Sequence, residues 1–394
     1  MEKVCLLVDL DDAGLQEDWH EKIYSFDLSL EVSYSNGEDV FPMLSTGDVV
    51  GMVVFCQEPS QNLFAILELF KKNVGAFPEF QVIVCDEPSP ILMTQVYEWG
   101  IETFWNYETW AEKAAHLTTQ IVSTLNDEES SEGKIFDLNQ SILTGNQERI
   151  IESEAAIEEH AEYDYLAAYS RGKALQATGR YNEAVEAFES AKGMNKKFRP
   201  SVSGIGENLL VLGRTDEAIE IFKDLEKVNK RNVDRKANLA SAYIAKGDLS
   251  TAKAYLKEAH KLNPKHPRIA ETKAQYLLST GKIGEAFKVM DNLQDVGPFF
   301  AAKLNEMGIK LSQKGKGKSA LALYKKAHKI VRPELKYKIS MNAALACYRL
   351  GMLDMSMKYL IRTEKEFGKS LPKVDKIKGA VKKAQKKQKT KAAG

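Results

Sequence analysis

The feature that most limits the fold of this chain is a short motif that returns every 34 residues. A glycine followed five residues later by a small residue occurs at this spacing at Gly179, Gly213, Gly247, Gly281 and Gly315. A sixth copy at Gly351 follows after 36 residues, and a degenerate copy at Gly145 lies one period upstream. A fixed period of this length indicates stacked supersecondary units, and glycine suits a tight turn inside each unit.

A small residue and a large residue flank each turn glycine at constant distances. Seven residues before the glycine stands Gly172, Gly206, Ala240, Ala274, Gly308 or Ala344. Nine residues after it stands Phe188, Phe222, Leu256, Met290, Tyr324 or Leu360. Helical spacing places these residues on one buried stripe, so we expect each unit to be two helices that cross closely at the small residue. Such a unit buries its apolar face only against its neighbours.

This pattern resembles the tetratricopeptide repeat family over residues 165–364, with residues 131–164 as a cryptic first unit. The resemblance implies an all-α superhelical solenoid whose first helices line a concave groove for a partner peptide or helix. The family pattern places Tyr169, Lys173, Gln176, Asn238, Ser241, Gln275, Asn305 and Asn342 in that groove. Several of these are amides, which can hydrogen-bond to an extended peptide backbone. The position often held by Trp in the family is filled here by Ala168, Lys236 and Leu304.

Residues 1–127 precede the repeats and show a different periodicity. Short β-branched runs predict strands at 4–8, 28–33, 49–56, 81–85 and 101–105, with helices at 61–73, 91–99 and 107–126. Five strands that alternate with helices favour an α/β domain with a doubly wound parallel sheet. The continuous apolar run at 49–56 is typical of a strand that is covered on both faces.

This N-terminal domain resembles the receiver domain of bacterial response regulators in the segments 3–9, 48–53 and 100–104. The resemblance implies a flavodoxin-like, five-stranded parallel sheet. It also implies acids that hold magnesium after the first strand, a phosphoacceptor aspartate ending the third, a hydroxyl residue ending the fourth and a lysine ending the fifth. Asp9, with Asp11 or Asp12, matches the magnesium position. A solvated acidic loop is the alternative interpretation.

The other three receiver positions lack the family's chemistry. The acceptor position falls on Val53, the hydroxyl position on Cys85 or Asp86, and the lysine position on Asn106 or Tyr107. A valine side chain cannot accept a phosphoryl group, and no cation would balance the new charge. We therefore predict a pseudo-receiver that keeps a surface for protein contact.

Aromatic residues gather around the predicted fifth strand and last helix of this domain, namely Trp99, Phe104, Trp105, Tyr107 and Trp110. Aromatic clusters are enriched at interface hot spots, so this segment is a candidate docking face. The alternative is that most of these side chains fill the core under the last helix.

Charge is divided unevenly along the chain although the total is zero. Residues 1–164 hold 33 Asp and Glu against 7 Lys and Arg, whereas residues 165–394 hold 22 against 48. We expect the acidic part to contact the basic superhelix of the same chain or of a second copy. The acidic, turn-forming segment 127–133 marks the domain boundary. The lysine-rich residues 365–394 predict a basic capping helix and a flexible tail.

Other kinds of chemistry lack support in the residue pattern. The four cysteines, Cys5, Cys56, Cys85 and Cys347, form no CxxC pair, so we expect reduced core thiols. The six histidines are scattered, and we expect no metal and no cofactor. The longest apolar run, 49–56, is too short to cross a bilayer, and the start of the chain lacks a secretory signal. A cytoplasmic location is therefore predicted.

Together these patterns predict a non-enzymatic protein-binding scaffold or adaptor in bacterial two-component signalling. Residues 1–127 would form a docking module that is not phosphorylated, and residues 128–164 an acidic linker with the cryptic repeat. Residues 165–364 would form six tetratricopeptide repeats that bind other proteins, such as signalling, motility or polarity components. Two alternatives are a phospho-switched regulator with an atypical acceptor and a polyanion or nucleic-acid binder that uses the basic half.

Overall fold

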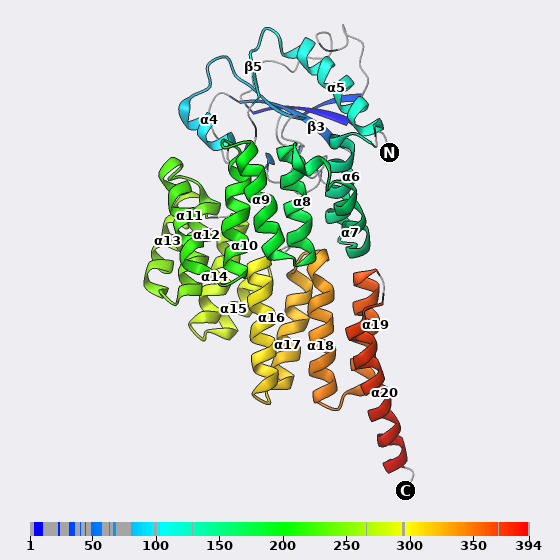
Figure 1. Cartoon of the computed structure of the whole chain (residues 1–394). Helices are drawn as coiled ribbons and strands as arrows, with labels where there is room; N and C mark the ends of the chain where they lie inside the picture. Colours follow the sequence, from blue (N-terminus) through cyan, green and yellow to red (C-terminus); the bar gives the residue numbers. More distant parts are fainter. Residues whose placement is uncertain are drawn as a thin grey trace.

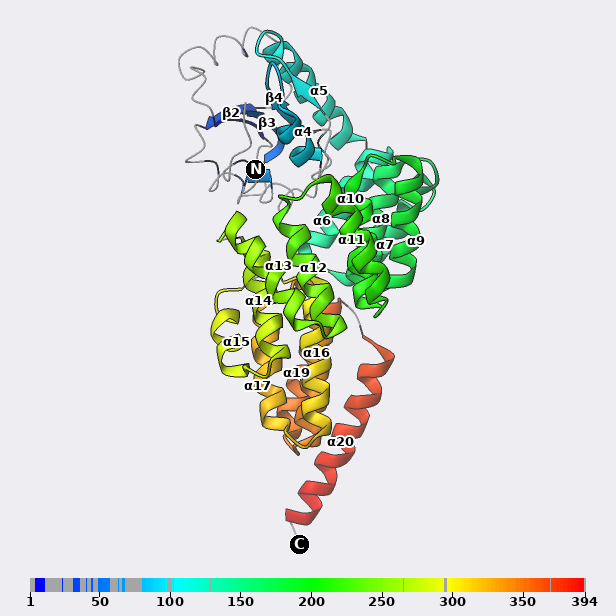
Figure 2. The same cartoon turned by 90° about the vertical axis from the view of Figure 1, so that its left-hand side faces the viewer.

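A small α/β domain and a long array of helices make up the computed structural model of this chain (Figure 1). The structure describes residues 4–10, 23, 31–35, 40, 44, 49–56, 63, 66–67, 80–97, 101, 103–127, 129–264, 266–293, 296–368 and 370–392. The α/β domain lies at one end of the molecule, and the C-terminal helix projects from the opposite end (Figures 1 and 2).

Five parallel strands form the sheet of the α/β domain. They are β1 (Val4–Asp9), β2 (Glu31–Ser35), β3 (Val49–Phe55), β4 (Gln81–Val84) and β5 (Phe104–Trp105). Their order, β2-β1-β3-β4-β5, is that of a flavodoxin-like doubly wound sheet, as predicted. Strand β5 starts at residue 104 instead of the predicted 101, and residues 28–30 of the predicted second strand lie outside the described residues.

Both faces of this sheet are buried. Successive residues of a strand point to opposite faces, so neighbouring residues belong to different cores. Leu7 belongs to the core that includes residues of α5 (Trp110–Asn126). Its neighbour Leu6 belongs to a second core that includes residues of α4 (Pro90–Val96). All seven residues of β3 are buried, which explains why its sequence is apolar throughout instead of alternating.

The helices after α5 alternate as first and second helices of successive units. The first helices are α6 (Ser131–Thr144), α8 (Tyr165–Thr178), α10 (Arg199–Val211), α12 (Val233–Lys246), α14 (Pro267–Ser279), α16 (Pro298–Gln313) and α18 (Lys336–Arg349). The second helices are α7 (Gln147–Ala156), α9 (Tyr181–Met194), α11 (Thr215–Val228), α13 (Leu249–Leu262), α15 (Ile283–Met290), α17 (Gly317–Ile330) and α19 (Leu353–Phe367). Short 3-10 turns, η3 (His160–Glu162) and η4 (Pro333–Leu335), precede α8 and α18, and α20 (Pro372–Ala392) ends the array.

The turn glycines all lie between the two helices of a unit, as predicted. Their φ angles run from 70° to 87°, a left-handed conformation that strains residues with a side chain. The degenerate copy at Gly145 has the same conformation, with φ of 70°. Side-chain caps set the starts of several helices, and examples are Asp164 for α8 and Asn232 for α12.

The small residue of a first helix receives the large residue of the second helix, as the pattern predicts. A Cβ atom on Gly172 would lie 2.7 Å from the ring of Phe188, and one on Gly206 would lie 2.6 Å from the ring of Phe222. The ring of Phe188 also lies 2.8 Å from the Cβ position of Gly204 in the next unit. One buried ring therefore packs within its own unit and against the neighbouring one.

The connection between the two parts of the chain is short. Asp127–Ser130 separates α5 from α6, and Ser130 caps α6 by accepting a hydrogen bond from the N–H of Gly133 at 3.0 Å. Helix α6 packs against both α7 and α8, so the first helix pair continues the stack of units.

The array doubles back after α14. Helix α15 has 8 residues, whereas α13 and α17 on either side have 14. After this short helix, α16 contacts α10 (Figure 1). The turn η4 contacts α6 and α8. The late units, from α16 onward, therefore lie against the early units, from α6 to α10.

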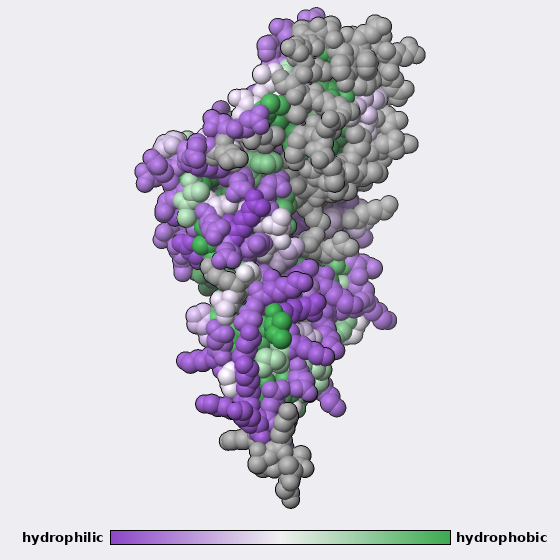
Figure 3. All heavy atoms as spheres, turned by 90° about the vertical axis from the view of Figure 1, so that its right-hand side faces the viewer, coloured by the Kyte–Doolittle hydropathy of each residue, from purple (hydrophilic) through white to green (hydrophobic). Residues whose placement is uncertain are grey.

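The C-terminal end of the array is polar. Val374 and Val381 of α20 are buried against α19, and the helix continues to Ala392, so the part of residues 365–394 predicted as a flexible tail is helical up to that residue. The reason is composition, because alanine, lysine and glutamine all favour helix. Figure 3 shows the molecule from the right-hand side of Figure 1, where hydrophilic side chains cover most of the described surface.

Two further predictions concern the cysteines and membrane-spanning helices. Cys5, Cys56, Cys85 and Cys347 are buried as thiols and none forms a disulfide. Burial raises the pKa of Cys5 to about 12, so this thiol is protonated and unreactive at neutral pH. Within the described ranges, no helix combines the length and the apolarity that a membrane span requires.

Candidate functional site

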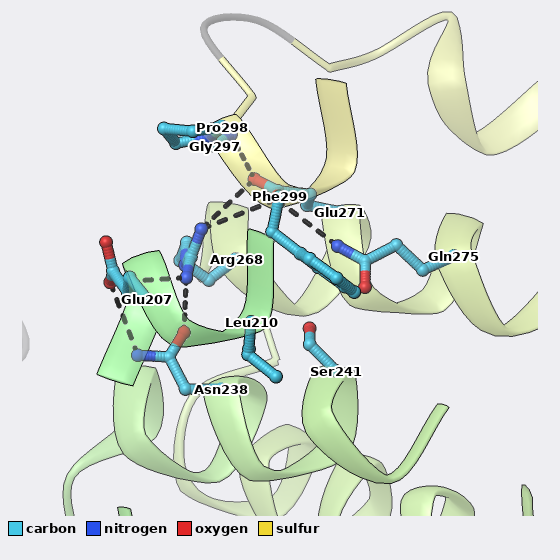
Figure 4. A pocket seen from close by; sticks show the side chains of 10 residues that line it. All are labelled: Glu207, Leu210, Asn238, Ser241, Arg268, Glu271, Gln275, Gly297, Pro298 and Phe299. Carbon is cyan, nitrogen blue, oxygen red and sulfur yellow. Dashed lines mark hydrogen bonds and ion pairs between the residues drawn. The ribbon is translucent and has the colours of Figure 1, made fainter. Parts of the chain in front are cut away.

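A hollow on the inner face of the array gathers polar side chains from several first helices, and we call it the inner hollow (Figure 4). It is lined by Glu207 and Leu210 of α10, Asn238 and Ser241 of α12, Arg268, Glu271 and Gln275 of α14, and Gly297, Pro298 and Phe299 at the start of α16. First helices of neighbouring units lie side by side, so residues far apart in the sequence meet here.

Arg268 occupies the centre of the inner hollow. Its guanidinium group donates a hydrogen bond to Oδ1 of Asn238. It also lies 3.4 Å from Oε1 of Glu271, 3.7 Å from Oε1 of Glu207 and 3.8 Å from Oδ1 of Asp234. Three carboxylates thus surround one cation, so the hollow favours ligand groups that donate hydrogen bonds or carry positive charge.

Glu271 is the most buried charged residue of the inner hollow, with 5% of its surface exposed. Its Oε2 accepts a hydrogen bond from the backbone N–H of Gly297 at 3.0 Å, and its Oε1 accepts one from Nε2 of Gln275 at 3.3 Å. These donors compensate for the burial of the carboxylate and tie α14 to the start of α16. Oε1 of Gln275 is buried without a hydrogen-bond partner in the described part of the chain.

Three of the eight predicted groove residues, Asn238, Ser241 and Gln275, line the inner hollow. Their exposed fractions are only 4%, 5% and 3%. Nδ2 of Asn238 donates to Oε1 of Glu207 at 3.4 Å, and Oγ of Ser241 lies 3.4 Å from Oγ1 of Thr272. The side chains of Asn238 and Ser241 are therefore engaged by neighbouring helices, whereas Gln275 bonds to Glu271 of its own helix.

The other five predicted groove residues lie outside the inner hollow. Tyr169 is 9% exposed and packs within the aromatic core, and Nζ of Lys173 lies 5.9 Å from the centre of its ring. Nε2 of Gln176 is buried and has no hydrogen-bond partner among the described residues. Asn342 donates a hydrogen bond of 2.6 Å to Asn305 and so links α18 to α16.

Glu207, Arg268 and Glu271 are absent from the eight residues predicted for the groove. The 34-residue period carries a signal for two of them, because Glu207 lies one period before Ser241 and Glu271 lies one period before Asn305. Arg268 has no such signal. Its role depends on the carboxylates that the fold brings around it.

The described residues of the candidate docking face of the α/β domain pack against the cores of the sheet. Trp110 is 2% exposed and packs edge-on against a phenylalanine of β3, with 5.1 Å between the ring centroids. Trp110 is therefore a core residue, in line with the alternative that these aromatic side chains fill the core under the last helix. Phe104, Trp105 and Tyr107 are half-buried, and Trp99 lies outside the described residues.

The receiver-like positions of this domain carry structural contacts. β3 continues two residues beyond Val53 to Phe55, and the side chain of Val53 is fully buried. Oδ1 of Asp86, just after β4, accepts a hydrogen bond of 2.9 Å from the backbone N–H of Tyr107, just after β5. This contact joins the carboxyl ends of two neighbouring strands.

The predicted magnesium position is only partly visible. Asp9 is the last residue of β1, whereas Asp11 and Asp12 lie outside the described residues. Among the residues that the structure does describe, no three His, Cys, Asp or Glu side chains come together as metal ligands.

Comparisons with known proteins concern the helical array. Tetratricopeptide repeat models match residues 166–198 and 209–276. A tetratricopeptide repeat protein from Parabacteroides merdae aligns with 64% of this chain and 98% of its own, at 15% identity and a TM-score of 0.37. A thermophilic tetratricopeptide repeat protein from Thermus thermophilus aligns with 56% of this chain and 98% of its own, at 20% identity and a TM-score of 0.30. A search of curated proteins gives no match.

The matched segments cover most of α8, all of α9 and α11 to α13, and part of α10 and α14, so these helices at the centre of the array match the tetratricopeptide repeat. Repeats of this type generally mediate interactions between proteins. The chain thus combines a five-stranded parallel sheet with a helical array whose central part matches tetratricopeptide repeats.

Proposed function

We propose that this chain is a non-enzymatic scaffold that holds a segment of a partner protein at the inner hollow. The observation that supports this proposal is the arrangement of Arg268 among Glu207, Asp234 and Glu271. The side chains of Arg268, Glu207 and Asp234 keep 24%, 34% and 37% exposure, so a partner can reach them from the rim. Since acids outnumber the cation, the fitting partner segment offers backbone N–H groups and a basic side chain.

For the α/β domain we propose a docking module that works without phosphorylation, which would make the chain an adaptor in bacterial signalling. The supporting observation is the receiver-like strand order together with the apolar side chains at the end of β3. The half-buried Phe104, Trp105 and Tyr107 are its candidate contact residues.

Acetyl phosphate is therefore expected to leave the full chain unmodified, because buried Val53 and the apolar end of β3 provide no acceptor carboxylate. Intact-protein mass spectrometry after incubation with acetyl phosphate and magnesium measures this. Acid-labile phosphate on Asp9, Asp11, Asp12 or Asp86 would show instead a phospho-switched regulator with an atypical acceptor.

Partner capture tests the proposed site. The full chain serves as bait, the captured protein is identified by mass spectrometry, and its affinity is then measured with purified components. Glu207→Lys is expected to weaken binding at least about tenfold, because it places a second cation beside Arg268 where the basic side chain of the partner would bind. Glu220→Lys is the matched control, because Glu220 is exposed on the second helix α11. Equal affinities of the two variants for the partner would show that the partner does not bind at the inner hollow.

A further inference from the structure

Contacts between early and late units close the array on one side, and we call this zone the seam. Nε2 of Gln147, at the start of α7, donates a hydrogen bond of 3.0 Å to the backbone oxygen of Glu334 in η4, 187 residues away in the sequence. A Cβ atom on Gly145 would lie 2.8 Å from the backbone nitrogen of Glu334, so the turn of the first unit touches η4 directly.

Lys338 of α18 extends the seam to the second unit. Its Nζ atom lies 5.6 Å from the ring centres of both Tyr181 and Tyr337, and it lies directly against the Cβ position of Gly179. Burial lowers the pKa of Lys338, and nearby Glu334 opposes this shift. The ammonium group thus loses hydration to make this contact, and this cost offsets part of the stability of the seam.

The inner hollow lies across the same division between early and late units. Glu207 and Arg268 belong to the early units, whereas Phe299 begins the late ones. The backbone N–H of Gly297 joins the two sides by its hydrogen bond to Glu271. Movement of the late units away from the early ones would therefore widen the hollow and expose its floor.

We propose that the seam is an autoinhibitory closure of the inner hollow. The late units, residues 298–392, stay against the early units while the seam is formed, and the partner gains the deep residues Asn238, Ser241 and Gln275 only after it opens. This inference rests on the proposed function, since it concerns access to the same site. The apparent affinity for a partner falls by the fraction of molecules that are open, so loosening the seam raises it.

Labelling of a cysteine in the hollow tests the closure without any partner. In the variant Ser241→Cys, the new thiol replaces a side chain that is 5% exposed, while the four native cysteines are buried. We expect slow reaction with 5,5′-dithiobis(2-nitrobenzoic acid) in this background. Adding Lys338→Glu, which replaces the ammonium group beside the ring of Tyr181 with a carboxylate, should speed labelling at least about tenfold, because the electron-rich face of the ring attracts a cation but repels an anion across the seam. Lys329→Glu, an exposed position of the same late units, is the control and should leave the rate unchanged.

A disulfide across the seam provides the opposite test. The Cβ position on Gly368 lies 3.4 Å from Cβ of Glu148, close to the separation that a disulfide requires. Oxidised Glu148→Cys with Gly368→Cys should return labelling in the Lys338→Glu background to the slow rate. Each single cysteine variant controls for strain, since Gly368 has φ of 96°.

Three results would overturn the closure. The first is a parent rate equal to that of a fully exposed cysteine, which would mean that the hollow is already open. The second is an unchanged rate in Lys338→Glu and also in Gln147→Ala, which covers the case that one variant fails to fold. The third is fast labelling that persists in the oxidised disulfide variant. None of these results depends on partner capture, so the closure and the proposed function are tested by separate experiments.

Discussion

Gly206→Val is expected to lower the free energy of unfolding by about 3 kcal/mol, at the upper end of the range for overpacked cores. A Cβ atom at this position would lie 2.6 Å from Cε1 and 2.7 Å from Cζ of Phe222, which is itself fully buried. The ring fills the crossing between α10 and α11 and has no exposed side toward which it can move. The two helices would have to separate, and the packing of neighbouring units would be strained with them.

Thermal and urea unfolding, followed by circular dichroism, measure this change. Gly193→Val is the matched control, because Gly193 also lies in a helix but a Cβ there meets no atom within 4 Å. We expect the control to unfold within about 0.5 kcal/mol of the parent chain. Combining Gly206→Val with Phe222→Leu should recover part of the loss, because a smaller side chain makes room. Equal effects of valine at both glycines would contradict the close crossing.

Lys236→Met is expected to lower the free energy of unfolding by about 2 kcal/mol, less than the loss for a fully buried ion pair. The side chain of Lys236 is 9% exposed, and its Nζ atom lies 2.9 Å from Glu226 and 2.7 Å from Glu258. Methionine keeps the length of the side chain and removes the charge. The carboxylate of Glu226, with 19% exposure, then loses its cation.

The exposed pair between Lys246 and Asp216 is the control, with exposed fractions of 50% and 79%. Lys246→Met should cost less than about 1 kcal/mol, because water replaces the lost contact. The double variant Lys236→Met with Glu226→Gln should be more stable than Lys236→Met alone, since it leaves no unpaired charge at this carboxylate. A loss at Lys236 no larger than at Lys246 would show that burial adds nothing to this cluster.

The dependence of this effect on pH has a defined sign. Burial alone would lower the pKa of Lys236, but its hydrogen bonds to Glu258 and Glu226 outweigh burial and raise the pKa above its usual 10.5. A group with a raised pKa in the folded state stabilises the fold below its unfolded pKa, and this contribution disappears as the pH rises through the folded value. The difference between the parent chain and Lys236→Met should thus be constant between pH 7 and 9, within about 0.5 kcal/mol, and shrink only in strongly alkaline solution.

The same lysine shows how far a repeat pattern can guide prediction. Its position is often tryptophan in tetratricopeptide repeats, and the sequence marks Lys236 only as a departure from that pattern. The structure shows that the departure is compensated, because Glu226 and Glu258 come from the helices on either side of α12. No spacing rule links the three residues, so the ion cluster could not be predicted.

The candidate site was likewise predicted in part from the sequence. Its position on the first helices is what the resemblance to tetratricopeptide repeats implies, and Asn238, Ser241 and Gln275 do line the inner hollow. Their burial does not follow from the period, because it depends on which units face one another. Arg268 becomes central for the same reason, since the carboxylates around it come from three helices.

The sequence by itself determined the local architecture of this protein. The turn glycines and the small residues that receive Phe188 and Phe222 depend on contacts within about two units, which leave a periodic signal. The doubly wound sheet depends on strands that alternate with helices along the chain. The tertiary structure alone decided that the array doubles back. The spacing from Gly281 to Gly315 stays at 34 residues although α15 is short, and the contact between Gln147 and Glu334 spans 187 residues. In the described part of the chain this contact does not recur with the period of the units. It results from the way each unit packs on the next along the whole array, and so it leaves no periodic pattern in the sequence.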